Sequence, residues 1–523
     1  MAEKDNNDLM AICKRRGFIW PSFDIYGGVA GMFDYGPTGF DLRNNIVEIW
    51  RDIYKGREGF IEIDSEYVTP AEVLKASGHV DKFSDPITYC TECHAPFRAD
   101  HLVKHVIENP DVLSYAQLDA AFVEHGITCP NCQGKLGPCE EFNLMFKTHI
   151  GPGNSRVGYL RPETAQGIFV NFLNVYRYNR EKLPLGVIQT GRSYRNEIAP
   201  RQGMVRMREF NQMEVELFID PQDKTWARFD EVRDERITLV PNTTLEPVEM
   251  TIGQAVDDHV IANEALAYFV NTTKKLLIRL GVDPARLRFR QHLQDEMAHY
   301  ANDCWDAEAL LSYGWTEICG IADRGCWDLS RHGQFSGTDM THFKKYDEPR
   351  EVQVRKIKAK HKALGPLFKG KAKDIAAVME TMPIDSVRDG KLALTVDGEQ
   401  VVLGEECFEV VDTVETVAGE RIIPNVIEPS HGLDRIFYTI LEHAYSYDEE
   451  KDYAVLRLKP EVAPIKVGVF PLMEKDGLDD VARKLCDAIH THRTQAMYDG
   501  SGSIGKRYAR MDEVGPPWCI TVD

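Results

Sequence analysis

From Gln212 to Leu217, polar and apolar side chains alternate without interruption, and this pattern constrains the fold more than any other feature of the chain. In an extended strand, one side carries Gln212, Glu214 and Glu216 and the other carries Met213, Val215, Leu217 and Ile219. Burying an unpaired carboxylate is costly, so we expect Glu214 to face a cleft. Residues 185–197 predict a preceding strand, and about ten loop residues join the two into a long antiparallel hairpin.

Size and composition limit the classes of protein that this chain can represent. A chain of 523 residues is too long for one hydrophobic core, so two to four domains are expected. The net charge of −20 argues against broad, non-specific nucleic-acid binding, although a local basic surface can still bind a polynucleotide. No apolar run of about 18 residues predicts a membrane span, and the N-terminus lacks the apolar core of a signal peptide. We therefore expect a cytoplasmic protein.

Helices and strands are expected in several other regions. Helical periodicity over residues 39–56 predicts an amphipathic helix, followed by a strand from Phe60 to Pro70. Residues 254–281 and 294–311 are also predicted to be helical. Residues 340–420 are polar and irregular, which is typical of an insertion. A strand near Val426 leads into a helix from Leu433, and a small α/β module begins near Ile465.

Three separated segments stand out, and the second and third of them carry residues suited to ATP chemistry. The first is Gly59 to Pro70, and the second is the hairpin that contains Arg195-Asn196-Glu197, Arg206 and Arg208-Glu209-Phe210. The third is Glu428-Pro-Ser430-His-Gly432-Leu-Asp434-Arg435. Arginine suits phosphates because it stays charged and binds bidentately, and an aromatic face suits adenine. In this order and spacing, the segments resemble the three signature motifs of class II aminoacyl-tRNA synthetases.

Further segments resemble the glycyl type within that class. They are Arg161-Pro-Glu163-Thr-Ala-Gln166, Gly320-Ile-Ala-Asp-Arg324, Arg290-Gln-His292 and the stretch from Glu296 through Ala301 to Cys304-Trp-Asp306. The resemblance implies an α+β fold. Its parts would be an antiparallel-sheet catalytic domain with helices, inserted zinc-ribbon-like and basic subdomains, and a C-terminal α/β anticodon-binding domain. It also implies a homodimer built on the first motif.

The resemblance assigns roles to individual side chains. Arg195 would hold the α-phosphate and the amino-acid carboxylate, Arg435 the γ-phosphate, and Phe210 would stack on adenine. The other residues expected around ATP are Asn196, Glu197, Arg206, Arg208 and Glu317. Glu163, Glu214 and Glu428 would surround the glycine ammonium, with Ser430 and Arg324 nearby. Glu317 and Glu428 would alternatively hold the Mg²⁺ that accompanies ATP, and the sequence does not separate the two roles.

The implied reaction is glycine activation by ATP and transfer of glycine to tRNA(Gly). Glycine has no side chain to recognise, so the pocket must bind its ammonium and carboxylate and exclude larger amino acids by size. Positioning and electrostatics would supply nearly all of the catalysis. Cys326-Trp327 departs from the family pattern, in which a smaller polar residue and Tyr or Phe are more usual.

Two pairs of cysteines have the spacing of metal knuckles. Cys90-Thr-Glu-Cys93 and Cys129-Pro-Asn-Cys132 are separated by 35 residues, which exceeds the usual zinc-ribbon linker. Four thiolates would form a closed, structural Zn²⁺ site. The alternatives are four unliganded cysteines, or Cys139 and His94 as substitute ligands. Twelve cysteines in 523 residues are too dilute for a disulfide framework.

Two further regions suggest contact with tRNA. Residues 344–373 hold eleven Lys or Arg against three Asp or Glu, and we favour the tRNA acceptor arm over a solvated face. Gly500-Ser-Gly502-Ser-Ile-Gly505 fits a dinucleotide fingerprint, which we reject because only eighteen residues follow it. The surrounding residues resemble an anticodon-binding module with Lys506, Arg507 and Arg510 as contacts. That module is expected to lack its last helix and strand.

These interpretations give a domain organisation. In order it is the first catalytic part (1–87), the Cys-rich insertion (88–145), the main catalytic part (146–339), the basic insertion (340–420), the last catalytic part (421–460) and the anticodon-binding domain (461–523).

Three rival functions stay open on the sequence alone. Another class IIa synthetase (prolyl, threonyl or histidyl) would need a larger pocket. A non-catalytic, nucleic-acid-binding accessory subunit would be expected to lose Arg195 and Arg435. A zinc-binding interaction module would leave the cleft carboxylates unexplained.

Overall fold

The computed structural model describes residues 2–107, 109–153, 155–200, 203–294, 296–297, 301–396, 398–448, 450, 453–491 and 494–523. The chain divides into two compact units, Met1–Met340 with Ile423–Asp523, and Thr341–Ile422. Among the helices described, none combines the length and the apolar character needed to cross a membrane.

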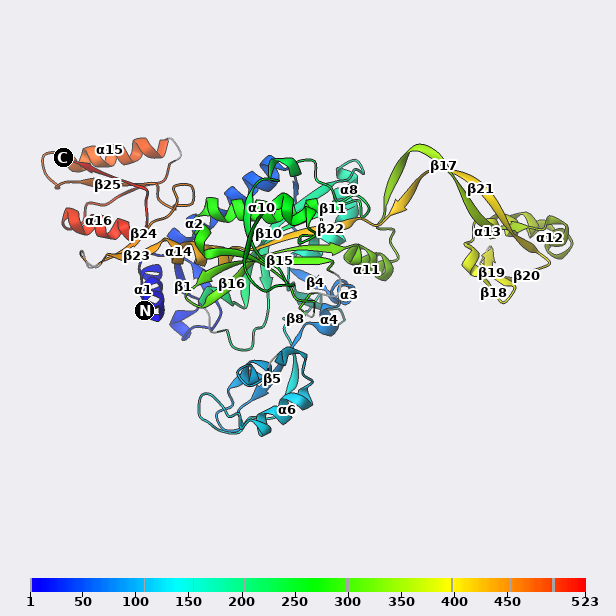
Figure 1. The fold of residues 1–523 in the computed structure, drawn as a ribbon, viewed down its shortest axis with the longest axis horizontal. Coiled ribbons are helices and arrows are strands. Elements are labelled where there is room, and N and C mark those ends of the chain that lie inside the picture. The colour runs from blue at the N-terminus through cyan, green and yellow to red at the C-terminus, as the bar shows by residue number, and fades with distance from the viewer. Residues whose placement is uncertain are drawn as a thin grey trace. The chain divides into compact units, whose positions relative to one another are not determined.

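A nine-stranded sheet forms the centre of the first unit (Figure 1). Its neighbours pair antiparallel except β3 with β10 and β12 with β14. In spatial order the strands are β13 (Val248–Thr251), β12 (Arg236–Val240), β14 (Leu287–Gln291), β15 (Asp303–Leu311), β16 (Gly314–Gly325), β22 (Asn425–Gly432), β11 (Glu209–Ile219), β10 (Leu185–Tyr194) and β3 (Ile61–Glu62). The expected α+β fold with an antiparallel catalytic sheet is confirmed.

Helices bury the apolar side of this sheet. The main core joins α2 (Pro37–Arg51), α10 (Glu264–Leu280) and α14 (Leu433–Ala444) to Met213, Val215 and Leu217 of β11. On the other side of the sheet, a smaller core lies around Phe218, with α7 (Ala165–Val170), α8 (Phe172–Tyr178) and α11 (Trp327–Ser336). The shorter elements of this unit are α1 (Ala2–Arg15), β1 (Ile19–Pro21), β2 (Phe33–Tyr35), β4 (Val68–Pro70), α3 (Ala71–Ala76), α4 (His79–Lys82), β8 (Lys147–His149), β9 (Val157–Leu160), α9 (Ile252–Asp257), β23 (Tyr445–Asp448) and β24 (Tyr453–Leu456).

The predicted hairpin forms with one register. Gln189 of β10 faces Glu214 of β11, and the pairing runs from Leu185 opposite Phe218 to Tyr194 opposite Glu209. Both sides of β11 from Asn211 onward are buried, so the alternation separates a hydrophobic side from a polar side that is also enclosed.

Several predicted elements differ from the observed ones. Residues 303–311 form strand β15 rather than a helix, because Cys304, Asp306 and Glu308 alternate with buried Trp305 and Ala307. The segment from Phe60 to Pro70 is split into β3 and β4. The helix predicted over 254–281 is broken into α9 and α10, where the Asn263 side chain caps the Leu266 N–H at 2.9 Å. The helix at 39–56 ends as α2 at Arg51 and continues as a π-helical turn, Asp52–Arg57.

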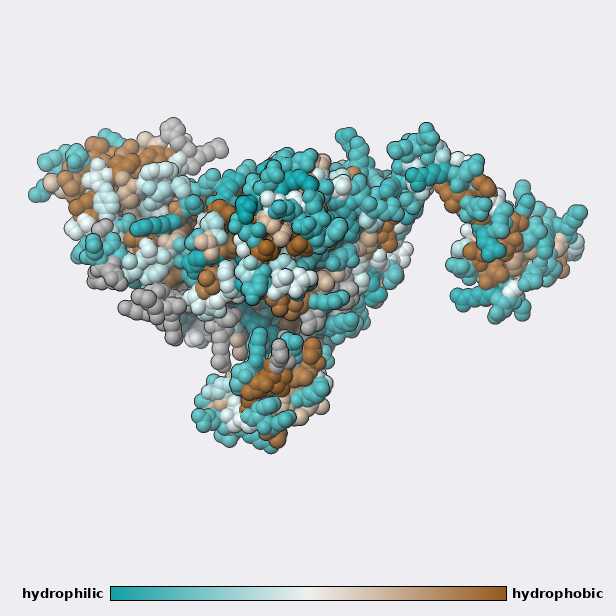
Figure 2. Space-filling view, viewed as in Figure 1, coloured by the Kyte–Doolittle hydropathy of each residue, from teal (hydrophilic) through white to brown (hydrophobic). Residues whose placement is uncertain are grey.

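The Cys-rich insertion has a small core of its own. Strands β5 (Ser84–Tyr89), β6 (Pro96–Arg98) and β7 (Glu140–Asn143) form a sheet, and α5 (Ala99–Val103) and α6 (Tyr115–Glu124) accompany it. Phe97, Val103 and Leu118 are buried between them. Figure 2 shows brown, hydrophobic residues on the surface of this subdomain, and Val123 of α6 is 81% exposed.

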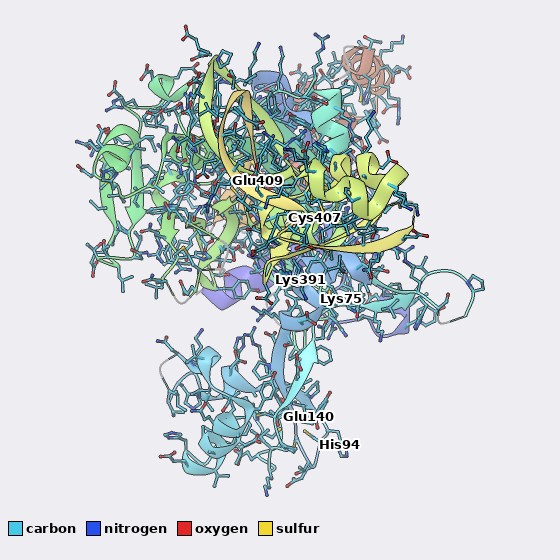
Figure 3. All side chains as sticks on the ribbon, turned by 90° about the vertical axis from the view of Figure 1, so that its right-hand side faces the viewer. Lys75, His94, Glu140, Lys391, Cys407 and Glu409 are labelled. Carbon is cyan, nitrogen blue, oxygen red and sulfur yellow. The ribbon has the colours of Figure 1, made fainter. Side chains whose placement is uncertain are left out.

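The second unit is more regular than the sequence predicts. Its ends form a long two-stranded ribbon, β17 (His342–Ala359) paired with β21 (Phe408–Ile422). The ribbon leads to α12 (His361–Phe368), α13 (Ala372–Glu380), β18 (Val387–Arg388), β19 (Lys391–Val396) and β20 (Glu399–Gly404). Cys407 is buried in their common core, and Figure 3 labels it with Lys391 and Glu409 of the same unit.

The C-terminal module is a parallel α/β layer. Strands β26 (Ala496–Tyr498) and β27 (Trp518–Val522) flank β25 (Val467–Pro471), with α15 (Leu478–Thr491) and α16 (Ile504–Asp512) between them in sequence. A strand, a helix and a further strand therefore fit between residue 496 and the end of the sequence, so our argument that the space is too short was wrong.

Candidate active site

The polar side of the sheet opens into a cavity of about 400 Å³. Strands β11, β16 and β22 supply its floor, because alternate residues of neighbouring strands project to the same side. The loop after β10 and the start of α14 supply its walls. The charged lining residues are Glu163, Arg195, Glu197, Arg206, Glu214, His292, Glu317, Arg324, Glu428, Asp434 and Arg435.

Two arginines stand at one end of this cavity. The guanidinium of Arg195 lies 5.2 Å from the centre of the Phe210 ring and donates to the Pro162 carbonyl oxygen at 3.2 Å. Burial lowers the pKa of Arg195, so its positive charge is poorly solvated and is available to an incoming anion. Arg435 forms an ion pair with Glu317 at 3.0 Å, and that positive charge lowers the pKa of Glu317. This end can bind polyphosphate.

Three carboxylates, Glu163, Glu214 and Glu428, also line the cavity. Glu214 accepts from Thr164 Oγ1 at 2.8 Å, while its second oxygen is buried without a hydrogen-bond partner among the described residues. Burial, together with the nearby charge of Glu428, raises the pKa of Glu214 to about 8. Burial also raises the pKa of Glu428 to about 7. The two carboxylates therefore repel each other, and a cation placed between them would relieve both.

Glu163 is held differently. Burial acts to raise its pKa, but His79 at 3.4 Å and the charge of Arg324 outweigh burial and hold the pKa well below its usual range. Gln166 also donates to Glu163 at 2.9 Å. Glu163 thus contributes a permanent negative charge beside two carboxylates that titrate near neutral pH.

Arg324 is fixed by two carboxylates. Its Nε and Nη2 donate to both oxygens of Asp328 at 2.8 and 2.9 Å, and its Nη1 donates to both oxygens of Glu428 at 2.9 and 3.0 Å. Such a fork restrains Glu428 in a single orientation, because the guanidinium is planar and bidentate. The part of the cavity lined by these residues is preorganised and anionic.

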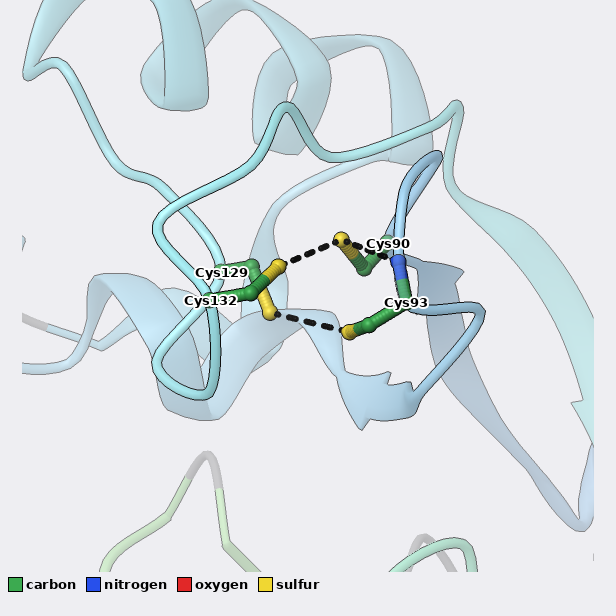
Figure 4. Close-up of side chains that lie close together, drawn as sticks. All are labelled: Cys90, Cys93, Cys129 and Cys132. Carbon is green, nitrogen blue, oxygen red and sulfur yellow. Dashed lines mark hydrogen bonds between the residues drawn. The ribbon is translucent and has the colours of Figure 1, made fainter.

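The Cys-rich insertion holds a second cluster of functional side chains. Sγ of Cys90 lies 3.4 Å from Sγ of Cys132, and Sγ of Cys93 lies 3.6 Å from Sγ of Cys129 (Figure 4). Four thiolates placed ~2.3 Å from a tetrahedral Zn²⁺ would be about 3.8 Å apart, so the cluster fits this ion closely. The backbone N–H groups of Cys93 and Glu92 point at Cys90 Sγ, at 3.5 and 3.4 Å, and lower the pKa of Cys90 to about 6.

Comparisons with known proteins agree on the family. Residues 146–382 match the model of the tRNA synthetase class II core domain (G, H, P, S and T), and residues 466–523 match an anticodon binding domain. The glycine–tRNA ligase of Methanothrix thermoacetophila is 50% identical over 518 residues, covering 98% of this chain and 90% of that protein. The glycine–tRNA ligase of Methanocaldococcus jannaschii is 45% identical, and the match covers 100% of this chain and 93% of that protein.

The chain belongs to the glycine–tRNA ligase family. Among solved structures, prolyl-tRNA synthetase of Giardia lamblia in complex with prolyl-adenylate has a TM-score of 0.54 at 13% identity, covering 100% of this chain and 69% of that one. At that identity the likeness concerns the fold alone.

The cavity is lined by most of the side chains that the sequence predicts for the active site. Eleven of them line it: Glu163, Arg195, Glu197, Arg206, Phe210, Glu214, Glu317, Arg324, Glu428, Ser430 and Arg435. Asn196 and Arg208 do not line it. The guanidinium of Arg208 donates to the carbonyl oxygens of Glu197 and Ala30, at 2.8 and 2.6 Å, so it ties the loop after β10 to the N-terminal segment.

Sequence reasoning missed the residues that support the carboxylates. Thr164, Gln166 and Asp328 are buried around the carboxylates, and their roles depend on contacts between segments far apart in the sequence. Glu216 is buried beside them, and neither of its oxygens has a hydrogen-bond partner among the described residues. Glu216 was the one with a readable signal, because it continues the alternation of Gln212 and Glu214. His292 also lines the cavity. Residues 298–300 of the family-like segment lie outside the described residues.

In the anticodon-binding module, one predicted tRNA contact was wrong. Arg507 is only 3% exposed, and its guanidinium donates to the carbonyl oxygens of Pro471, Gly500 and Gly502. It therefore stabilises the glycine turn from inside the module. Lys506 is exposed, and Arg510 forms two bonds to Asp499 at 2.7 and 2.8 Å.

Proposed function

We propose that this protein is a glycine–tRNA ligase. It would activate glycine with ATP to glycyl-adenylate and pyrophosphate, then transfer glycine to the 3′ end of tRNA(Gly). The observation that carries this proposal is the union, in one cavity, of the arginine pair Arg195 and Arg435 with the carboxylates Glu163, Glu214 and Glu428. The arginine pair suits the phosphates of ATP, and the three carboxylates suit the small ammonium group of glycine.

The residues would act mainly by positioning. With the glycine ammonium among the carboxylates, a carboxylate oxygen of glycine attacks the α-phosphorus in line, and pyrophosphate leaves. Arg195 would neutralise charge at the α-phosphate, Arg435 at the γ-phosphate, and Phe210 would stack on adenine. Mg²⁺ bound with ATP would supply further charge neutralisation, and Glu317 would hold it, together with Glu428 if that carboxylate binds the metal instead of the ammonium. Arg324 is saturated by Asp328 and Glu428, so we assign it to holding Glu428 in place.

The pyrophosphate exchange reaction tests the proposal directly. The full chain is incubated with ATP, labelled pyrophosphate and each of the twenty amino acids in turn. Exchange with glycine alone is expected, because a site that binds the ammonium and carboxylate of glycine can exclude larger amino acids by size. Exchange with no amino acid would favour the accessory-subunit alternative, and exchange with proline, threonine or histidine would favour another class IIa synthetase.

Glycine use is expected to depend on pH between about 6 and 8.5. Burial raises the pKa of Glu428 to about 7 and of Glu214 to about 8, so below these values the carboxylates bind protons and attract the ammonium weakly. kcat/KM for glycine should therefore rise with pH, by about tenfold per pH unit for each proton that must leave, and level off above about pH 8. The KM for ATP, measured over the same range at saturating glycine, should change much less.

We propose that the four-cysteine cluster binds a structural Zn²⁺ and that the protein works in the cytoplasm, where thiols stay reduced. His94 is exposed (Figure 3) and Cys139 lies outside the group of four, so neither is needed as a substitute ligand.

Removal of this zinc is expected to unfold the Cys-rich insertion. Zinc-thiolate sites contribute folding free energy directly, and the core of the insertion is small. A strong chelator, or the double variant Cys93→Ser/Cys132→Ser, should make residues 88–145 sensitive to protease while the main core stays resistant. Cys407→Ser, in the second unit, is the control and should leave that pattern unchanged. Equal protection of residues 88–145 with and without metal would contradict the zinc assignment.

We further propose that tRNA contacts the second unit and the C-terminal module, and that the first motif forms a homodimer. Several lysines and arginines of residues 344–373 have acidic partners, such as Arg355 with Asp412 and Lys356 with Glu415, so the net basic charge of this surface is smaller than its sequence suggests.

Tyr67 and Val68 of the first motif are partly exposed, which suits an interface between two copies.

A further inference from the structure

Strands β14 and β15 place three side chains with metal-binding atoms on one face. Gln291 pairs with Trp305, and the N–H of His292 donates to the Cys304 carbonyl oxygen at 3.0 Å. His292 therefore stands opposite Cys304. Asp306 lies two residues farther along β15, so it shares the face of Cys304, since alternate residues of a strand project to the same side.

The donor atoms of these three residues converge. The imidazole nitrogen, the thiol sulfur and a carboxylate oxygen all lie within 4.8 Å of one another. Nε2 of His292 is 2.8 Å from Oδ1 of Asp306. Even so, neither ring nitrogen meets hydrogen-bond geometry with any partner among the described residues, although both are shielded from solvent. At this distance the two atoms form an ion pair when the ring is protonated, and a metal ion could take the place of that proton between them.

Arg290 organises this arrangement from outside. Its Nη2 donates to Oδ2 of Asp306 at 3.2 Å, while Oδ1 is the oxygen that lies beside His292. A second-layer hydrogen bond of this kind orients a ligating carboxylate. The positive charge of Arg290 is offset by Glu308 at 3.1 Å and Glu296 at 2.7 Å, so the guanidinium does not by itself exclude a cation from the space beside Asp306.

We propose that His292, Cys304 and Asp306 form a binding site for a divalent transition-metal ion such as Zn²⁺, separate from the four-cysteine cluster. Imidazole nitrogen, thiolate sulfur and carboxylate oxygen are the three ligand types that Zn²⁺ prefers. Mg²⁺ is disfavoured, because it takes oxygen ligands in octahedral geometry. On binding, the thiol of Cys304 loses its proton to solvent.

Three protein ligands leave the fourth position of a tetrahedral ion open. His292 lines the active-site cavity, and Gly320, which pairs with Asp306 across β15 and β16, presents no side chain between Asp306 and that cavity. Water or another small ligand can occupy that open position. By contrast, the four-cysteine cluster is closed to further ligands.

The number of zinc ions per chain tests this site. The full chain is stripped with chelator, dialysed against buffered micromolar Zn²⁺, and analysed for metal by mass spectrometry. Two ions per chain are expected. His292→Gln and Cys304→Ala should each bind one ion, and Cys93→Ser/Cys132→Ser should also bind one. Cys319→Ala removes another buried cysteine of the same sheet and should still bind two.

A second measurement does not depend on how the His292 and Cys304 variants fold. In the Cys93→Ser/Cys132→Ser protein, Zn²⁺ should protect Cys304 from alkylation at least tenfold, and Mg²⁺ should not. One ion per chain that is lost entirely with Cys93 and Cys132, or equal alkylation of Cys304 with and without Zn²⁺, would overturn the proposal. Neither assay contains ATP, glycine or tRNA, so failure here leaves the proposed ligase activity unaffected.

Discussion

Arg195→Ala is expected to reduce glycine-dependent pyrophosphate exchange at least about 1,000-fold while the protein stays folded. The guanidinium stands over Phe210, and its one described hydrogen bond is to the Pro162 carbonyl oxygen, so its loss removes little structure. Removing one preorganised donor from a transition state typically costs about 100- to 1,000-fold, and Arg195 would face both the α-phosphate and the substrate carboxylate. Steady-state exchange rates and the thermal unfolding midpoint measure both parts of this prediction.

Arg192→Ala is the matched control. Arg192 lies in β10, three residues before Arg195; it is more than half exposed and pairs with Glu209 on the surface. Its removal should change the exchange rate less than about threefold, since exposed ion pairs contribute little. Arg195→Lys should recover only part of the activity, because an ammonium lacks the planar, bidentate fork of guanidinium. Exchange by Arg195→Ala within tenfold of the parent would rule out the assigned role.

Glu214→Gln is expected to raise the KM for glycine about 100-fold and to change the KM for ATP less than about threefold. The amide oxygen can still accept from Thr164 Oγ1, so the change removes charge and preserves shape. Losing one charged partner of a buried ion pair costs about 2–5 kcal/mol, and 100-fold corresponds to about 2.7 kcal/mol. The variant should also have a shallower pH dependence of kcat/KM for glycine, because one of the two titrating carboxylates is gone.

Glu209→Gln, five residues earlier on the same strand, controls for loss of a carboxylate from β11. Glu209 pairs with Arg192 outside the cavity, so the KM for glycine should stay within about twofold. If Glu214→Gln raised the two KM values equally, the carboxylate would support the cavity as a whole and would have no specific contact with the ammonium.

The part of the site that could be predicted lies on strands with strict alternation. Glu214 was placed correctly at the cavity because its neighbours Met213 and Val215 are apolar, and a strand has only two sides. Arg195, Phe210 and Arg435 followed from the family resemblance. By the same alternation, β15 could have been recognised as a strand. The high helix propensity of Ala307, Glu308 and Leu310 suggested a helix instead, and pairing with β14 and β16 overrode that local preference.

The parts that could not be predicted depend on contacts across the fold. Asp328 locks Arg324 from α11, His79 reaches Glu163 from α4, and neither distance can be read from a linear sequence. Arg507 shows the opposite error. A basic residue in a family-like module suggested a tRNA contact, whereas burial and three carbonyl acceptors give it a structural role.

The polar side of β11 has a consequence for folding as well as for binding. If the β10–β11 hairpin slipped by one residue, Gln212, Glu214 and Glu216 would point into the hydrophobic core and Met213, Val215 and Leu217 would point into the cavity. Burying these three polar side chains in the hydrophobic core would cost far more free energy than the slipped strand pairing could provide. The residues that equip the enzyme to hold its substrate therefore also disfavour the slipped register of the hairpin, so they favour the pairing that forms the active protein.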